Sequence, residues 1–178
     1  ITVSFDCNYR QKLWERWGGD GVPVLLDILE CADLVFGDQR DVALLLGGTF
    51  EQADPVDRRR AAAEAAFARF PQLTRLTSTI RTQHSVEEHE LSGVLVARDG
   101  HWSTRTYPVG GIVDRIGGGD AFAAGLIHGL RTAMAPQDAL EFGVAAGVLK
   151  HAISGDFNLA TEEDVAALAA GGGLDVRR

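Results

Sequence analysis

Three consecutive glycines, Gly117, Gly118 and Gly119, constrain the fold of this chain more than any other feature. They follow Ile112-Val113, which we expect to be a buried strand end, and precede a long apolar run from Ala121 to Leu130. Glycine permits backbone conformations and close approaches that other residues resist, so the run predicts a tight turn from strand to helix. N–H groups at a helix start carry partial positive charge, and such a turn is suited to bind an anion.

Short apolar segments alternate with helical patterns along the rest of the chain, which indicates an α/β fold with a largely parallel sheet. We expect strands at 1–5, 34–36 and 73–80, and an antiparallel hairpin of 92–97 and 102–107 around a type I′ turn at Asp99-Gly100. We expect helices at 22–31, 41–46, 56–70, 121–130, 136–152 and 161–171. Asp54-Pro55 and the capping box Thr161 to Asp164 are start signals for two of these helices.

Composition narrows the classes of partner. The formal net charge of -8 gives no electrostatic footprint for nucleic acid or an anionic membrane surface. No apolar stretch approaches the ~20 residues of a membrane span, and residues 1–10 carry no signal-peptide pattern. Cys7 and Cys31 have no metal-binding spacing, so we expect two reduced thiols in a cytoplasmic protein. The chain starts directly on an expected strand, and we expect further residues to precede Ile1 in the intact protein.

A carboxylate, Asp120, shares the turn with the glycines. Phosphoryl transfer to an alcohol needs an anion hole for the transferred group and a base for the hydroxyl proton. Two other interpretations stay open from the residues alone. The glycines can form a turn without a ligand, with Asp120 as a helix cap. A dinucleotide-binding fingerprint would need a third glycine where Phe122 stands, so it fits poorly.

The run from Asp114 to Phe122, DRIGGGDAF, resembles the second signature of PfkB-family, ribokinase-like sugar kinases, D-T-x-[GA]-[AG]-G-D-x-F. The resemblance implies that the three glycines form the anion hole and that Gly117 and Gly119 contact the nucleotide. It also implies that Asp120 is the catalytic base and touches the substrate, and that Asp114 lies near a monovalent cation, K⁺, or the phosphates. Arg115 and Ile116 replace the usual threonines, whose hydroxyl contacts this chain cannot make.

A second match lies near the start of the chain. Asp6, Asn8 and Arg10 resemble the D-x-N-x-R segment of the 2-keto-3-deoxygluconate kinases within this family. The resemblance implies that these residues bind the substrate, with Arg10 on its carboxylate. A guanidinium fork suits a carboxylate in two-point contact. From the residues alone, Arg10 can equally be a solvated loop residue and Asp6 a strand-end cap.

Two further segments resemble the nucleotide-binding region of the same subgroup. They contain Thr79 and Arg81, in the sequence STIR, and Asn158, in the sequence GDFN. The resemblance implies nucleotide contacts for all three residues. Taken alone, Arg81 can be a surface charge and Asn158 a turn residue.

One segment departs from the family pattern. The family carries N-x-x-E after the second strand, where this chain has Asp38 and Asp41. Both carboxylates can hold Mg²⁺ through water, and Asp38 would also lie near the nucleotide. Arg40 adds a positive charge that competes with the metal ion.

The resemblance as a whole implies a ribokinase-like three-layer α/β/α core, with residues 1–178 as the C-terminal nucleotide-binding and catalytic part, without the N-terminal part and its lid. It implies an ATP- and Mg²⁺-dependent kinase for a hydroxyl of a keto-deoxy sugar acid, which can form a homo-oligomer as a full-length protein. The fragment alone can be inactive. The alternatives are a kinase for a neutral sugar such as ribose or fructose, and a truncated, non-catalytic ATP-binding module.

Overall fold

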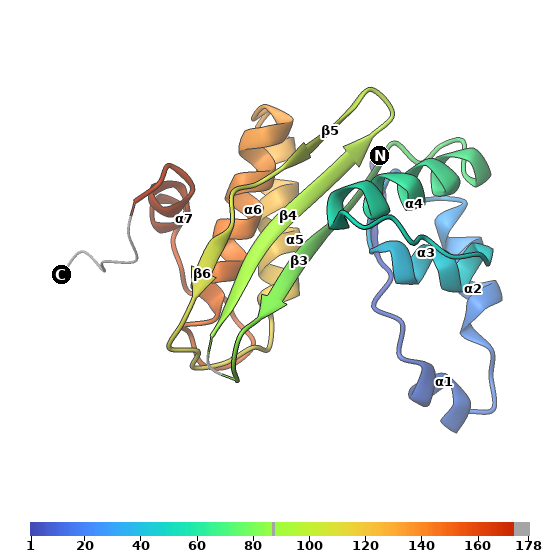
Figure 1. Ribbon diagram of the computed structural model, residues 1–178, viewed down its shortest axis with the longest axis horizontal. Coiled ribbons are helices and arrows are strands. Elements are labelled where there is room, and N and C mark those ends of the chain that lie inside the picture. The colour runs from blue at the N-terminus through green and yellow to red at the C-terminus, as the bar shows by residue number, and fades with distance from the viewer. Residues whose placement is uncertain (87, 173–178) are drawn as a thin grey trace. The chain divides into compact units, whose positions relative to one another are not determined.

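A computed structural model describes residues 1–86 and 88–172 of this chain (Figure 1). The residues form two compact units. The first unit contains Ile1–Ser78 and Val94–His101, and the second contains Thr79–Gly93 and the chain from Trp102 onward. Two long strands, β3 (Arg75–Gln83) and β4 (His89–Ala97), each contribute residues to both units.

The strands form a mixed sheet, which has six members within the described residues. The order is β1-β2-β3-β4-β5, and β6 pairs with β4 off this path. The remaining strands are β1 (Ser4–Asp6), β2 (Leu34–Phe36), β5 (Gly100–Ser103) and β6 (Tyr107–Val109). β1 with β2 and β2 with β3 are parallel, whereas β4 with β6 is antiparallel. The predicted α/β class and both kinds of pairing are confirmed.

The first unit packs helices against the short parallel strands. Its helices are α1 (Gln11–Arg16), α2 (Gly21–Leu29), α3 (Gln39–Leu46) and α4 (Pro55–Arg69), and α3 lies beside α4 (Figure 1). Asp54 caps α4 as predicted, because its Oδ1 accepts the N–H groups of Val56 and Asp57. Phe70, Leu73 and Leu76 are almost fully buried between these elements. Each such side chain contributes roughly 1.5–3 kcal/mol through burial.

The second unit is built around α5 (Gly118–Arg131) and α6 (Pro136–Lys150), which lie side by side (Figure 1). Glycines make this close contact possible: a Cβ atom on Gly125 would lie 3.0 Å from the Cα of Gly143. A Cβ atom on Gly93 of β4 would lie 2.5 Å from Val144, so α6 also packs tightly on that strand. The last helix, α7 (Glu162–Ala169), begins with the predicted capping box of Thr161 and Asp164.

The predicted hairpin is partly wrong. The turn lies at Arg98-Asp99, and none of residues 98–100 has a positive φ, so it is not type I′. The Arg98 guanidinium anchors the turn by donating to the carbonyl groups of Phe67, Leu73 and two neighbouring residues. The predicted strand 102–107 is split into β5 and β6. At the interruption, the Thr104 N–H donates to the Gly93 carbonyl oxygen, but the Gly93 N–H donates to the Thr104 hydroxyl.

Two further expectations about local structure fail. Ile112-Val113 is not a strand, and Val113 is 62% exposed, because β6 ends at Val109 and the chain continues as a loop. Helix α1 has no counterpart in the prediction. It buries none of its residues, so it lacks the apolar periodicity by which a helix is recognised in a sequence.

Candidate active site

The glycine turn begins helix α5 in the second unit. Gly117 is the N-cap residue and adopts a left-handed conformation, with φ 76°. A Cβ atom at Gly117 would lie 2.5 Å from the carbonyl oxygen of Asp156, a distance that real Cβ atoms do not reach. Both the backbone angle and the close approach therefore require glycine at this position.

Gly118 and Gly119 differ in what surrounds them. A Cβ atom on Gly118 would lie 3.1 Å from the imidazole of His151, whereas one on Gly119 would meet no atom within 4 Å. Gly119 has no positive φ either, so neither the backbone nor the neighbours of this chain require glycine there. Its position in the first turn of α5, where N–H groups lack intrahelical acceptors, leaves an open surface that a ligand can approach.

Asp120 follows in the first turn of α5, and its side chain is exposed. Within residues 1–86 and 88–172, the Asp120 carboxylate forms no hydrogen bond and no ion pair, and α5 has no side-chain cap. The interpretation of Asp120 as a helix cap is therefore not supported. An uncommitted carboxylate beside open helix N–H groups can accept a proton from a bound ligand.

Asp114 fastens the loop before the turn to the loop after α6. Its Oδ1 accepts the Ile116 N–H at 2.9 Å, and its Oδ2 accepts the Gly155 N–H at 3.0 Å. These hydrogen bonds hold the pKa of Asp114 below its usual value. A monovalent cation beside Asp114 would have to share oxygens that already serve two donors, and a cation there stays a prediction.

Three basic side chains near the turn were not predicted as site residues. His151 is buried and its Nδ1 lies 2.7 Å from the Gly147 carbonyl oxygen, while Lys150 is fully buried. His89 of β4 stacks edge-on against His151, with ring centroids 4.9 Å apart. Burial, followed by the charges of His151 and Arg115, lowers the pKa of His89 to about 4. The one sequence signal for Lys150 and His151 is that they shortly precede the GDFN segment that contains Asn158.

The residues predicted to contact the nucleotide in the second unit lie on two different elements: Asn158 in the loop after α6, and Thr79 and Arg81 on β3. Asn158 stabilises a turn, since its Oδ1 accepts the Ala160 N–H and its Nδ2 approaches the Ala146 carbonyl oxygen at 3.4 Å. Arg81 is exposed on β3, two residues after Thr79 on the same strand. Because successive side chains of a strand point to opposite faces, Thr79 and Arg81 lie on the same face of β3. Their roles toward a nucleotide stay predictions.

In the first unit, polar residues follow the carboxyl ends of the parallel strands β1 and β2. Asp6, the last residue of β1, pairs in register with Phe36, the last residue of β2. Gly37 and Asp38 follow Phe36 in the chain. The Asp6 Oδ1 accepts the N–H of Asn8, which has a positive φ of 30°. Parallel strands end at the same edge of a sheet, so this edge gathers the predicted carboxylates, as the carboxyl edges of α/β sheets commonly do at ligand sites.

Asp38 and Asp41 form the capping box that starts α3. Asp38 accepts the Arg40 N–H at 2.7 Å, and Asp41 accepts the Asp38 N–H at 2.8 Å. Burial raises the pKa of Asp38, but hydrogen bonds from the Arg40 side chain and backbone outweigh it and hold the pKa below its usual value. The Arg40 guanidinium contacts both Asp38 oxygens, at 2.7 to 3.2 Å. Arg40 therefore already pairs with this carboxylate, and its competition with a metal ion stays a prediction.

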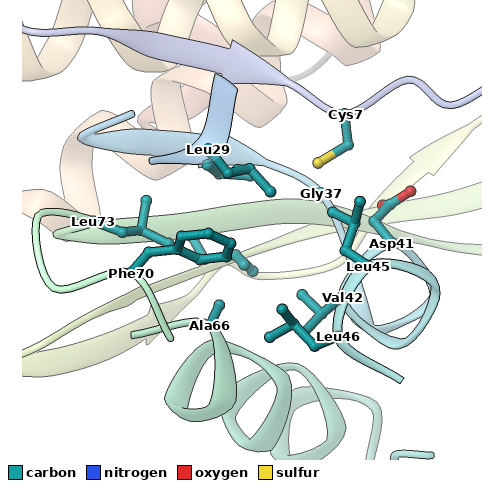
Figure 2. A pocket seen from close by; sticks show the side chains of 12 residues that line it. Cys7, Leu29, Gly37, Asp41, Val42, Leu45, Leu46, Ala66, Phe70 and Leu73 are labelled. Atoms are coloured by element: carbon teal, nitrogen blue, oxygen red, sulfur yellow. The ribbon is translucent and has the colours of Figure 1, made fainter. Parts of the chain in front are cut away.

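Cys7 lies beside these carboxylates, at one end of an apolar pocket (Figure 2). Figure 2 shows Cys7 and the Asp41 carboxylate at that end, with Leu29, Phe70 and Leu73 toward the other. Burial, followed by the charges of Asp41, Asp6 and Asp38, raises the pKa of the Cys7 thiol to about 12. Burial and the neighbouring Asp38 and Asp6 charges likewise raise the pKa of Asp41. Asp6, Asp38 and Asp41 are thus brought within electrostatic reach of one another.

Two arginines flank this edge in different ways. Arg59 of α4 is buried, and its Nε donates to the Ser78 hydroxyl at 2.8 Å, while its charge lowers the pKa of Asp38 after the larger effect of Arg40. Arg59 was not among the residues predicted from the sequence. Arg10 is exposed at the start of α1, and no hydrogen bond or ion pair of its guanidinium occurs within the described part of the chain.

The predicted residues therefore fall into two groups, one in each unit. Asp6, Asn8, Arg10, Asp38 and Asp41 belong to the first unit, and the glycine turn with Asp114, Asp120, Thr79, Arg81 and Asn158 belongs to the second. Among residues 1–86 and 88–172, no three His, Cys, Asp or Glu side chains are grouped so that they could hold a metal ion. In the same residues, no helix is both long enough and apolar enough to cross a membrane.

This chain is similar to known proteins along most of its length. Residues 1–158 match the model of the pfkB family carbohydrate kinases. A 2-dehydro-3-deoxygalactonokinase of Haloferax volcanii is 26% identical over 177 residues, which are 99% of this chain and 50% of that protein. Crystal structures of a pfkB family carbohydrate kinase from Listeria grayi (33% identical, TM-score 0.84) and of a 2-dehydro-3-deoxygluconokinase from Thermotoga maritima (30% identical, TM-score 0.85) each align with 96% of this chain and 50% of their own.

The chain belongs to the pfkB family of carbohydrate kinases. Its fold is the α/β fold of the ribokinase-like structures, and it spans about half the length of the relatives that it matches. Among those relatives are kinases named for two keto-deoxy sugar acids, the class of substrate that the residues around Arg10 predict.

Proposed function

We propose that this chain is the nucleotide-binding and catalytic part of an ATP-dependent kinase that phosphorylates a hydroxyl group of a keto-deoxy sugar acid. The observation that carries the proposal is the start of α5. There, a glycine that the chain itself does not require, Gly119, stands next to the uncommitted carboxylate of Asp120. Membership of a carbohydrate kinase family, and relatives that are named for keto-deoxy sugar acids, support it.

In this proposal the N–H groups of the glycine turn stabilise negative charge on the transferred phosphoryl group. The substrate hydroxyl oxygen forms a bond to the γ-phosphorus while the bond from that phosphorus to the β–γ bridging oxygen breaks. ADP leaves with the electron pair of the broken bond, and the hydroxyl proton passes to the Asp120 carboxylate. Asp120 is exposed in the first helical turn, so substrate and base can meet without any rearrangement of α5.

Mg²⁺ would enter with the nucleotide, because phosphate oxygens and water supply most of its ligands in kinase sites. Asp38 and Asp41 are the carboxylates proposed to hold the ion through water. Oxygen donors of this kind fit Mg²⁺, but Arg40 already occupies both Asp38 oxygens and would have to turn away. Asp41 retains one oxygen that does not accept the Asp38 N–H.

The substrate and adenine contacts are proposed by the same family pattern. Arg10 presents an exposed guanidinium for the sugar carboxylate, with Asp6 and Asn8 beside it on the loop after β1. Thr79, Arg81 and Asn158 are proposed to contact the nucleotide. A cytoplasmic location and a homo-oligomeric full-length protein belong to this proposal as well.

Nucleotide binding is tested by calorimetric titration of the chain with MgATP, next to Gly119→Asp and Gly119→Ala. Both side chains fit the open space at Gly119, and an acid is favourable in a first helical turn, so both variants should fold. We expect the carboxylate to abolish binding by repelling the phosphates, and Ala to weaken it less than about tenfold. Equal affinity of the wild type and Gly119→Asp would rule out the glycine turn as the phosphate site.

One observation favours a second candidate, a module that binds ATP without transferring phosphate: the ion pair of Arg40 with Asp38 removes a predicted magnesium ligand. MgATP binding without transfer, with transfer gained in Arg40→Met, would support this candidate.

The choice between an acidic and a neutral sugar rests on Arg10. Arg10→Ala should impair the use of a keto-deoxy acid strongly and the use of ribose or fructose little.

A further inference from the structure

Lys150 is a buried charge with few partners. It is the last residue of α6, and its side chain is fully buried. The sequence holds one other lysine, Lys12, and its remaining basic side chains apart from histidine are arginines. Within the described residues its ammonium makes one hydrogen bond, to the Ile153 carbonyl oxygen at 2.9 Å. An ammonium has three N–H donors, and burying it costs several kcal/mol unless other groups compensate. A purely structural role would be filled more easily by an apolar side chain.

The location of this charge connects it to the glycine turn. The Lys150 Cε lies 3.2 Å from the point where a Cβ atom on Gly117 would stand, so the end of the side chain lies against the buried side of the turn. The loop after Lys150 is fastened to the same turn, because Val113 donates to the His151 carbonyl oxygen at 2.8 Å and Gly155 to Asp114 at 3.0 Å.

No carboxylate neutralises Lys150 by direct contact within the described part of the chain. The acid whose ionisation it affects is Asp114, and both Asp114 oxygens are already used by the N–H groups of Ile116 and Gly155. His151, Arg115 and Arg81, the other basic groups around the turn, do not offset the charge of Lys150. Its positive charge therefore adds to that of the helix N-terminus from behind the turn, on the side away from the open surface at Gly119.

We propose that Lys150 is a positioning residue whose ammonium supplies positive charge behind Gly117, strengthens the binding of nucleotide phosphates, and takes the place of the monovalent cation predicted beside Asp114. The inference rests on the proposed function, because it assigns a role at the same phosphate site. It leaves Asp114 to organise the two loops through its backbone hydrogen bonds.

The test compares MgATP affinity of the wild type, Lys150→Met and Lys12→Met in buffers of KCl and of choline chloride at equal ionic strength. Methionine has a similar length without the charge, and Lys12 is the matched control because it is exposed in the first unit. We expect equal wild-type affinity in both salts, an unchanged Lys12→Met, and at least about a tenfold loss in Lys150→Met. We also expect KCl to restore part of that loss, which a merely structural defect would not show.

The two proposals can fail separately. A folded wild type that binds no MgATP in either salt would contradict the proposed function and the role of Lys150 with it. Wild-type binding that requires K⁺ would overturn the role of Lys150 alone, and this result needs no variant. Wild-type affinity in Lys150→Met would do the same. If Lys150→Met fails to fold, Lys150→Gln and the comparison of the two salts for the wild type still decide the question.

Discussion

The glycine turn of the second unit and the acidic edge of the first unit were both predicted to bind parts of one ligand, but they are built differently. The turn depends on missing side chains: Gly117 is required by its φ and by the Asp156 carbonyl oxygen, and Gly119 leaves a surface open. The acidic edge depends on side chains that bind each other, since Asp38, Arg40 and Asp41 already form a capping box and an ion pair. The turn is therefore prepared for a ligand, whereas the acidic edge must exchange partners to bind one.

The largest effect is expected at the carboxylate of the turn. Asp120→Asn keeps the shape of the side chain and removes the base, and should lower phosphoryl transfer to a keto-deoxy sugar acid by about 10²- to 10⁴-fold. The affinity for MgATP should change less than about threefold, because the N–H groups of the turn remain. Transfer is measured as ADP release that depends on the sugar acid. A variant with the wild-type rate would remove Asp120 from the mechanism.

The next effect concerns the backbone of the turn. Gly117→Val places a β-branched side chain at φ 76° and against the Asp156 carbonyl oxygen, and should lower the free energy of unfolding by about 3 kcal/mol. Urea denaturation measures the loss. The control is Gly110→Val, because Gly110 has no positive φ and no neighbour within 4 Å of a Cβ atom. Equal losses at the two positions would show that the turn imposes no special requirement.

The smallest effect is expected at the acidic edge. Asp38→Asn retains a capping oxygen but loses the charge paired with Arg40, so the free energy of unfolding should fall by about 0.5–1 kcal/mol at pH 7. The pKa of Asp38 is lowered in the folded state, so the stabilisation is present above the ordinary value of 3.8 and is lost as the pH falls below it. The difference between Asp38→Asn and wild type should therefore shrink as the pH falls from 3.8 through the lowered pKa of Asp38, and vanish below that pKa. A difference that is independent of pH would indicate lost packing instead of lost charge.

Features set by neighbouring residues were predictable from the sequence. The Asp54 and Thr161 caps, the helix that follows the glycines and the short strand at Leu34–Phe36 all depend on local patterns. The capping box of Asp38 was overlooked although its acids stand three residues apart. Arg59, His89 and Lys150 could not be found in this way, because their roles depend on partners from other elements or on burial.

The proposed function depends above all on the N–H groups at the start of α5, which are proposed to hold the nucleotide phosphates. The most direct measurement is the change in amide chemical shifts of the ¹⁵N-labelled chain during titration with MgATP. We expect the largest changes at Gly117, Gly118, Gly119 and Asp120, with smaller changes at Asp38 and Asp41. Saturable changes confined to the first unit, with the four amides of the turn unmoved, would contradict the claim.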